Sequence, residues 1–240
     1  MEPFFFGEHR DLFGAYHMAT GMPRRHGVLI AGPLLNEGIR AQFALRRIAE
    51  RLSARGYDVL RFDYKGLGNS PVPSSNARVA DWAANIVTAA DELPAIAGVE
   101  TSTLIAVRFG ACLAADLMRK RSLKRLLLWD PVLDGARWIE DLHACRDNLP
   151  IRLRDAVRSN EFMGHEMHEG FAEELKTRCN LSVPADEVAV VLSSGYRDSS
   201  DVENLTRHID KVQYDCQWTS YNSSVIYSAD IIETICNRLI

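Results

Sequence analysis

Short strand-like runs alternate with longer amphipathic stretches along most of the chain. Runs typical of strands, several of them continuously apolar as in strands buried on both faces, cover residues 27–31, 57–62, 103–107, 123–129, 188–192 and 211–217. Two shorter runs near the start, residues 3–6 and 12–17, are separated by a turn and predict an opening β-hairpin. Strands that alternate with helices are typical of βαβ units, so the sequence predicts the α/β class with a mainly parallel twisted sheet flanked by helices.

Amphipathic helices are predicted between these strands. In residues 42–55 one face carries the apolar side chains of Phe43, Leu45, Ile48, Ala49 and Leu52. The preceding residues 32–38 are predicted to form a loop. Further helices are expected at residues 79–93, 111–118, 202–209 and 229–239.

The middle of the chain departs from this alternation. Between residues 132 and 187 the pattern is helical, amphipathic and rich in charge. We interpret residues 132–187 as an inserted helical cap over the carboxyl edge of the sheet, where open α/β sheets place their sites. Residues 1–131 and 188–240 are expected to form one core domain.

Charge and hydropathy narrow the classes of partner. The 240 residues carry a net charge of −4 at pH 7, which gives no reason to expect a nucleic-acid partner. The main basic cluster, residues 119–121 with Lys124 and Arg125, comes at the end of a predicted helix, and we interpret it as favourable charge at a helix carboxyl terminus. No apolar run approaches the roughly 18 residues that span a bilayer.

Cysteine usage bears on the compartment. Five widely spaced cysteines, odd in number and without a CxxC pair, argue against a zinc site or a disulfide framework and for a reducing compartment. The first residues contain early acids and no long apolar run, unlike a signal peptide. We therefore expect a cytoplasmic protein, and the sequence leaves the oligomeric state open, a homodimer included.

The most informative stretch is the strand-turn-helix sequence of residues 103–117. Its centre, residues 106–110, reads AVRFG, with small residues two positions before and two positions after Arg108. This is the layout of a nucleophile elbow, which normally reads G-x-S-x-G. Arginine offers no attacking oxygen or sulfur and stays protonated in proteins. The elbow scaffold is therefore present without a nucleophile.

Nearly the whole chain resembles the α/β-hydrolase fold superfamily. The likeness is carried by FFFG at residues 4–7, LFGAYH at 12–17, LRRIAERL at 45–52, LRFDYKGLGNS at 60–70 and LWDPVLDG at 128–135. Within that superfamily the chain is most similar to the serine-aminopeptidase-like branch and its exosortase-associated hydrolases. The resemblance implies an acyl-hydrolase fold with a Ser-His-Asp triad, in the chain order nucleophile, acid, base.

The same resemblance implies a degenerate triad. The nucleophile position falls on Arg108, and the acid position falls on Asp198. The base is expected within residues 218–227, which contain no histidine, and the last histidine of the chain is His208. Two of the three parts are therefore missing, which makes ordinary ester hydrolysis unexpected.

Other groups of the implied pocket come from three loops. The oxyanion-hole donors implied by the resemblance are the backbone N–H of Phe109 and that of Leu34 or Leu35. Asp63 and Asp130 follow strand ends and are candidate pocket acids for a proton transfer. No cofactor is predicted.

Two interpretations of Arg108 remain open. In the first, its guanidinium pairs with an internal carboxylate, that of Asp198, Asp130 or Asp63, because buried charges are generally paired. In the second, Arg108 and the helix amino terminus hold the carboxylate or phosphate of a ligand.

One stretch of the predicted cap is rich in histidine and glutamate, which are metal-binding residue types. His165 and His168 lie three residues apart and are followed by three glutamates, but a third well-placed ligand is not identified. The solvated face of a cap helix is the simpler interpretation, and no metal is predicted.

The sequence thus favours a non-hydrolytic homologue that binds an acyl or small anionic ligand, or a partner protein, under its cap. One alternative is a repurposed biosynthetic enzyme that performs a lyase, isomerase or transfer reaction, with Arg108 as electrostatic stabiliser. The other is an esterase or thioesterase with a relocated triad. The fold alone does not separate these classes.

Overall fold

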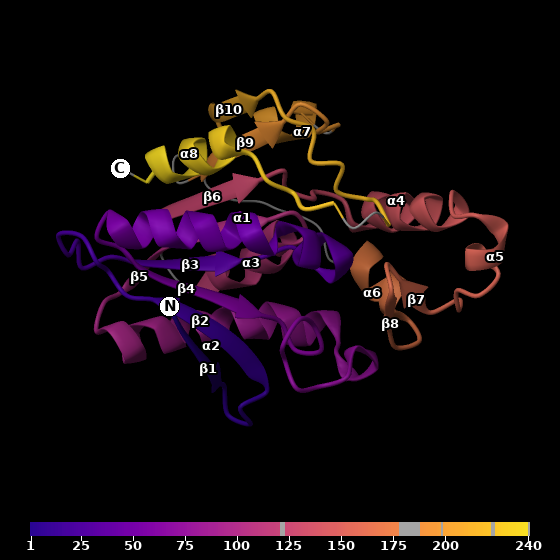
Figure 1. Ribbon diagram of the computed structural model, residues 1–240, viewed down its shortest axis with the longest axis horizontal. Helices are drawn as coiled ribbons and strands as arrows, with labels where there is room; N and C mark the ends of the chain where they lie inside the picture. The colour runs from indigo at the N-terminus through magenta and orange to yellow at the C-terminus, as the bar shows by residue number, and fades with distance from the viewer. Residues whose placement is uncertain (121–122, 178–187, 198, 222–223, 240) are drawn as a thin grey trace.

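A mixed sheet forms the centre of the protein (Figure 1). The computed structural model describes residues 1–120, 123–177, 188–197, 199–221 and 224–239. The strands of the sheet are β1 (Glu2–Phe6), β2 (Leu12–His17), β3 (Gly27–Ala31), β4 (Asp58–Asp63), β5 (Thr101–Val107), β6 (Arg125–Trp129), β9 (Val188–Ser193) and β10 (His208–Val212). Their spatial order is β1-β2-β4-β3-β5-β6-β9-β10. Neighbours from β4 to β10 are parallel, and the β1–β2 hairpin pairs antiparallel with β4, so the predicted parallel sheet and opening hairpin are confirmed.

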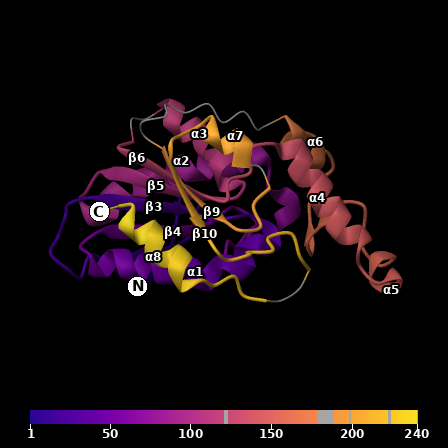
Figure 2. The same ribbon diagram turned by 90° about the horizontal axis from the view of Figure 1, so that it is seen from above.

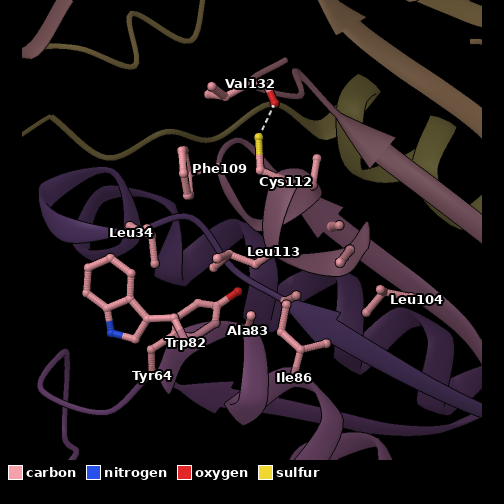
Figure 3. Packing of buried hydrophobic residues seen from close by; sticks show 14 of the residues in the cluster. Leu34, Tyr64, Trp82, Ala83, Ile86, Leu104, Phe109, Cys112, Leu113 and Val132 are labelled. Carbon is pink, nitrogen blue, oxygen red and sulfur yellow. Dashed lines mark hydrogen bonds between the residues drawn. The ribbon is translucent and has the colours of Figure 1, made fainter. Parts of the chain in front are cut away.

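Helices cover both faces of this sheet. They are α1 (Leu35–Ala54), the 3-10 turn η1 (Ser74–Asn76), α2 (Val79–Ala97), α3 (Gly110–Lys120), α7 (Ser199–Glu203) and α8 (Ala229–Asn237). Figure 2 shows α1 and α8 on one side of the sheet and α2 and α3 on the other. Ile48 of α1 and Ile235 of α8 belong to the apolar cluster on the first face. Trp82 of α2 and Leu113 of α3 belong to the cluster on the second, part of which is drawn in Figure 3.

Burial on both faces explains the continuous apolar runs of the central strands. Every residue of β3 is buried, and so are the last four of β6. Because helices cover both faces, successive side chains that point in opposite directions all leave water. The sequence pattern therefore located these strands to within about two residues.

The residues interpreted as a cap lie beyond the carboxyl ends of the parallel strands (Figure 1). They form α4 (Gly135–Asp147), α5 (Ile151–Arg154), β7 (Glu161–Phe162), β8 (His165–Glu166) and α6 (Phe171–Lys176), and residues 178–187 lie outside the described part. Phe171 joins this segment to the core, because its ring contacts Phe162 at 5.1 Å and Trp82 at 5.7 Å between centroids. The segment is mainly helical, as its pattern predicts, but it also contains a short antiparallel ribbon formed by β7 and β8.

Several local predictions are wrong. Helix α1 begins at Leu35, so half of the predicted loop at residues 32–38 is helical. Phe43, predicted on the inner face of this helix, is 49% exposed, because it lies beside the buried stripe that includes Ala44 and Ile48. The predicted helix at residues 202–209 ends at Glu203 in α7, and its final residues belong to β10. The strand predicted at residues 211–217 therefore begins earlier, at His208, and ends at Val212. Apolar spacing over so few residues does not separate a helix from a strand.

Membrane and cysteine expectations are also tested. Within the described residues, no helix combines the length and the apolar character that crossing a membrane requires. Cys145, Cys216 and Cys236 carry free thiols, whereas Cys112 is disulfide-bonded, so the expectation of reduced cysteines is wrong at that position. The Cys112 sulfur is buried in the core, 2.9 Å from the carbonyl oxygen of Val132 (Figure 3). Cys179 lies outside the described residues.

Candidate functional site

The turn between β5 and α3 holds Arg108 in a strained backbone conformation. Its φ is +53°, a left-handed value that side chains other than glycine rarely adopt. Three backbone hydrogen bonds of 3.1 Å fix it: the Arg108 N–H donates to Trp129 O, and the N–H groups of Ala111 and Val132 both donate to Arg108 O. Gly110 is required beside it, because a Cβ there would lie 2.9 Å from the carbonyl oxygen of Ala31.

The Arg108 guanidinium is paired with Glu37, from the first turn of α1. Its Nε lies 3.3 Å from both carboxylate oxygens of Glu37, and its Nη2 lies 3.2 Å from Oε1. The Glu37 side chain is 0% exposed and that of Arg108 is 10% exposed. Trp138 of α4 also donates from Nε1 to Glu37 Oε1 at 3.2 Å. The buried carboxylate thus receives hydrogen bonds from two directions.

Burial and pairing have opposite effects on the pKa of Arg108. Burial disfavours its charge, but the neighbouring Glu37 carboxylate outweighs that effect and raises the pKa of Arg108 above its ordinary value. The Arg108 Nη1 also donates to the Asp130 carbonyl oxygen at 3.2 Å. Arg108 therefore stays charged, within a fixed ion pair at the carboxyl edge of the sheet.

Asp130, at the end of β6, has its own partners. Its Oδ1 accepts from the backbone N–H of Ser193 and its Oδ2 from Trp218 Nε1, both at 2.7 Å. The Trp218 ring in turn lies 5.5 Å from the Arg108 guanidinium carbon. Asp130 thus positions the indole that covers Arg108, and both carboxylate oxygens are engaged.

A cavity of about 520 Å³ lies next to this network. Its walls come from α4, from the loop after β9 and from the segment after β10, and its lining residues are Arg108, Arg137, Asp141, Ser193, Gly195, Tyr196, Arg197, Asp215, Gln217, Trp218, Thr219 and Ser220. Three guanidinium groups and two carboxylates face it. Because none of these lining residues is a histidine, the cavity offers its hydroxyl groups no imidazole base.

The structure gives Arg108 a partner that the sequence did not suggest. Of the three carboxylates considered, Asp130 contributes only its carbonyl oxygen, and Asp198 lies outside the described residues. Asp63 instead accepts from the backbone and side-chain nitrogens of Asn69, at 2.8 and 3.1 Å. Burial raises the pKa of the Asp63 carboxyl, and those bonds oppose the shift. One available signal was the position of Glu37 just after β3, since β3 and β5 are adjacent parallel strands and end at the same edge.

The implied oxyanion-hole residues surround the same edge. Phe109 is buried and stacks on Trp138 with ring centroids 4.7 Å apart. Leu34 and Leu35 are buried where α1 begins, and Leu35 has a positive φ of 54°. Phe109, Leu34 and Leu35 all belong to the larger apolar cluster of the core.

The histidines lie away from this cavity. His208 begins β10, paired in register with Ala189 at the amino-terminal end of the parallel strands. His165 lies in β8 and His168 follows it, so their expected place on a helix is wrong. The His168 Nε2 is 3.5 Å from a Glu174 carboxylate oxygen. Among the described residues no group of three or more His, Cys, Asp or Glu side chains could hold a metal ion.

Comparisons with known proteins relate this architecture to solved structures. No protein-family model matches the chain, and no curated protein matches its sequence. An α/β serine hydrolase homologue from Coxiella burnetii is similar with 13% identity and a TM-score of 0.61, over 100% of this chain and 97% of the other. The mouse α/β hydrolase domain-containing protein 10 is similar with 16% identity and a TM-score of 0.58, over 100% and 97%.

A thioesterase domain from the curacin biosynthetic pathway is also similar, with 15% identity, a TM-score of 0.59 and coverage of 100% of this chain and 99% of that domain. All three likenesses extend over the whole chain while the sequences have diverged widely. The strained turn after β5, which leads into α3, is also the strand-turn-helix arrangement of a nucleophile elbow. The chain therefore has the α/β-hydrolase fold.

Proposed function

We propose that the chain is a non-hydrolytic protein of the α/β-hydrolase fold, which binds a small acyl or other ligand bearing a carboxylate or phosphate in the cavity beside Arg108. The observation that carries this proposal is the Arg108–Glu37 ion pair at the turn where hydrolases place their nucleophile. Its charges are compensated internally, so the pair is a stable part of the site. The cavity next to it supplies the binding surface.

Ester hydrolysis needs groups that this site lacks. A serine or cysteine nucleophile is activated by an adjacent base, and arginine offers neither an attacking atom nor a removable proton. Ser193, Thr219 and Ser220 supply hydroxyls to the cavity, but none of the described residues that line it is a histidine. Asp130 is a poor substitute base, because its buried carboxylate already accepts from Ser193 and Trp218 and is not among the described groups that line the cavity.

The guanidinium groups and the volume of the cavity support an anionic ligand. Glu37 neutralises Arg108, and the walls also carry the guanidinium groups of Arg137 and Arg197, which are matched in number by the carboxylates of Asp141 and Asp215. Guanidinium groups bind carboxylates and phosphates through paired hydrogen bonds. A volume of about 520 Å³ lies within the ordinary range of small-molecule pockets. The rings of Tyr196 and Trp218 provide apolar wall for an acyl chain.

Calorimetric titration of the full chain with butyrate and with inorganic phosphate tests this proposal. Arg137→Gln removes one guanidinium from the cavity, and Arg152→Gln is the matched control on the exposed face of α5. A charge-assisted hydrogen bond contributes roughly 1.5–3 kcal/mol, so the Kd for the preferred anion is expected to rise about tenfold or more in Arg137→Gln alone. Equal affinities in all three proteins, or no binding of either anion by the wild type, would contradict the proposal.

A further inference from the structure

A second cluster of positive charge lies at the opposite edge of the sheet, where the parallel strands begin. Two adjoining cavities of about 280 Å³ each share Lys124, Arg125 and Leu239 in their linings. We name the charged surface of these two cavities the basic groove, and its members are Arg24, His26, Lys124, Arg125, His208 and Arg238. Both linings include Leu239, close to the end of the chain that is marked C at the left of Figure 1.

Acidic groups are missing from the lining of the groove. Among the described residues that line either cavity, none is an aspartate or glutamate. Asp210 compensates one member only, because its Oδ1 accepts from Arg238 Nη2 at 2.6 Å. The guanidinium groups of Arg24 and Arg125 instead donate to backbone carbonyl oxygens, and Lys124 forms no ion pair with any described residue. This local excess stands out on a chain whose net charge is −4.

Aromatic contacts hold part of the groove in place. The Arg24 guanidinium carbon lies 5.1 Å from the centre of the Tyr57 ring, and the His26 ring meets the same ring edge-on at 5.4 Å. The Tyr57 hydroxyl donates to the Leu239 carbonyl oxygen. The His26 Nε2 is 2.8 Å from Thr103 Oγ1. These contacts hold Arg24 and His26 in place around Tyr57 in one of the two cavities, so a ligand would find these side chains already arranged.

The cations of the groove repel one another in the absence of an anion. Burial lowers the pKa of His26, and the charges of Lys124, Arg125 and Arg24 lower it further. The positive charges of Lys124, Arg125 and Arg24 are therefore close enough to act together on His26. An anion in the groove would relieve the repulsion, since Arg and Lys are the residues that bind phosphate oxygens.

We propose that the basic groove binds a small organic phosphate with at least two negative charges, whose phosphates lie at the shared rim formed by Lys124 and Arg125. Two small lobes that meet at a cationic rim fit such a ligand, because each lobe is near the lower limit of ligand-pocket volumes. The site is distinct from the cavity beside Arg108, which lies at the carboxyl ends of the same strands. This proposal assigns Lys124 and Arg125 to ligand binding, whereas the sequence pattern suggested only a favourable charge at the carboxyl end of a helix.

Isothermal titration of the full chain with inorganic pyrophosphate at low ionic strength tests the proposal. Lys124→Glu reverses a charge at the shared rim, and Arg152→Glu makes a similar reversal on exposed α5, outside both cavities. We expect the Kd to rise at least about tenfold in Lys124→Glu, and to change less than about twofold in Arg152→Glu. Added salt is expected to weaken wild-type binding, as for exposed charges generally.

Further variants locate the binding. Arg137→Gln is expected to keep the component of pyrophosphate binding that Lys124→Glu removes, because Arg137 lines the other cavity. No detectable wild-type binding, equal losses in Lys124→Glu and Arg152→Glu, or a loss in Arg137→Gln alone would each overturn the proposal. So would Lys124-dependent binding of a single-stranded oligonucleotide that is much tighter than that of pyrophosphate, because the site would then belong to nucleic acid.

Discussion

Replacing Glu37 by glutamine tests the ion pair on which the site is built. The Glu37 carboxylate is 0% exposed and Arg108 is 10% exposed, so the substitution leaves a buried guanidinium without a counter-charge. Breaking a buried pair in this way costs about 3–5 kcal/mol of the free energy of unfolding. At roughly 2–4 °C per kcal/mol for a chain of this size, Tm is expected to fall by about 10 °C.

A double-mutant cycle separates the pair from the two single effects. Arg108→Gln leaves Glu37 with Trp138 as its remaining donor and is also expected to destabilise. The double variant Arg108→Gln with Glu37→Gln removes both charges, so it is expected to be more stable than the sum of the single losses by at least about 2 kcal/mol. Urea unfolding followed by tryptophan fluorescence and circular dichroism gives the four free energies.

The exposed pair of Glu173 and Lys176 is the control. Their charged atoms are 2.6 Å apart, but the Glu173 side chain is 73% exposed, so Glu173→Gln is expected to cost less than about 1 kcal/mol. A loss below about 1 kcal/mol in Glu37→Gln, or strictly additive losses in the cycle, would refute the reasoning that Arg108 and Glu37 form a buried pair.

Two further predictions concern stability. Gly110→Ala places a Cβ 2.9 Å from Ala31 O and 3.0 Å from Gly32 O, so about 1–3 kcal/mol of unfolding free energy is expected to be lost in urea titration, and an unchanged midpoint would contradict the close approach. Burial and the charge of Arg61 lower the pKa of His17 to about 4. Because the unfolded chain then binds the proton more tightly, stability is expected to fall by up to about 3 kcal/mol as the pH drops from about 6.5 to about 4. The free energy of unfolding of His17→Gln, measured at several pH values, should not show this fall between pH 6.5 and about pH 4. A fall as large as that of the wild type would show that His17 does not cause it.

The strands and the strained turn could be predicted because each depends on local sequence. Full burial on both faces demands apolar side chains at every position, which marks strands such as β3 and β6 directly. The turn at Arg108 is marked by the small residues on either side of it. Gly110 in particular is required by its close approach to Ala31.

The partner of Arg108 could not be predicted, because Glu37 is 71 residues away in sequence. Pairing between such distant residues depends on which strands are neighbours, and only the sheet order brings the start of α1 beside the end of β5. The predicted loop at residues 32–38 also hid this partner, because Glu37 in fact lies in the first turn of α1. The basic groove could not be predicted for the same reason, because Arg24 and Lys124 are distant in sequence and come together only where the strands begin.

Reaction with a fluorophosphonate probe, read by intact mass together with turnover of p-nitrophenyl butyrate, tests the central claim most directly. The account predicts no covalent adduct and a rate equal to that of buffer, because the strained turn carries Arg108 in an ion pair with Glu37 and the described cavity lining contains no histidine. A stoichiometric adduct on a serine, accompanied by steady ester turnover, would contradict it.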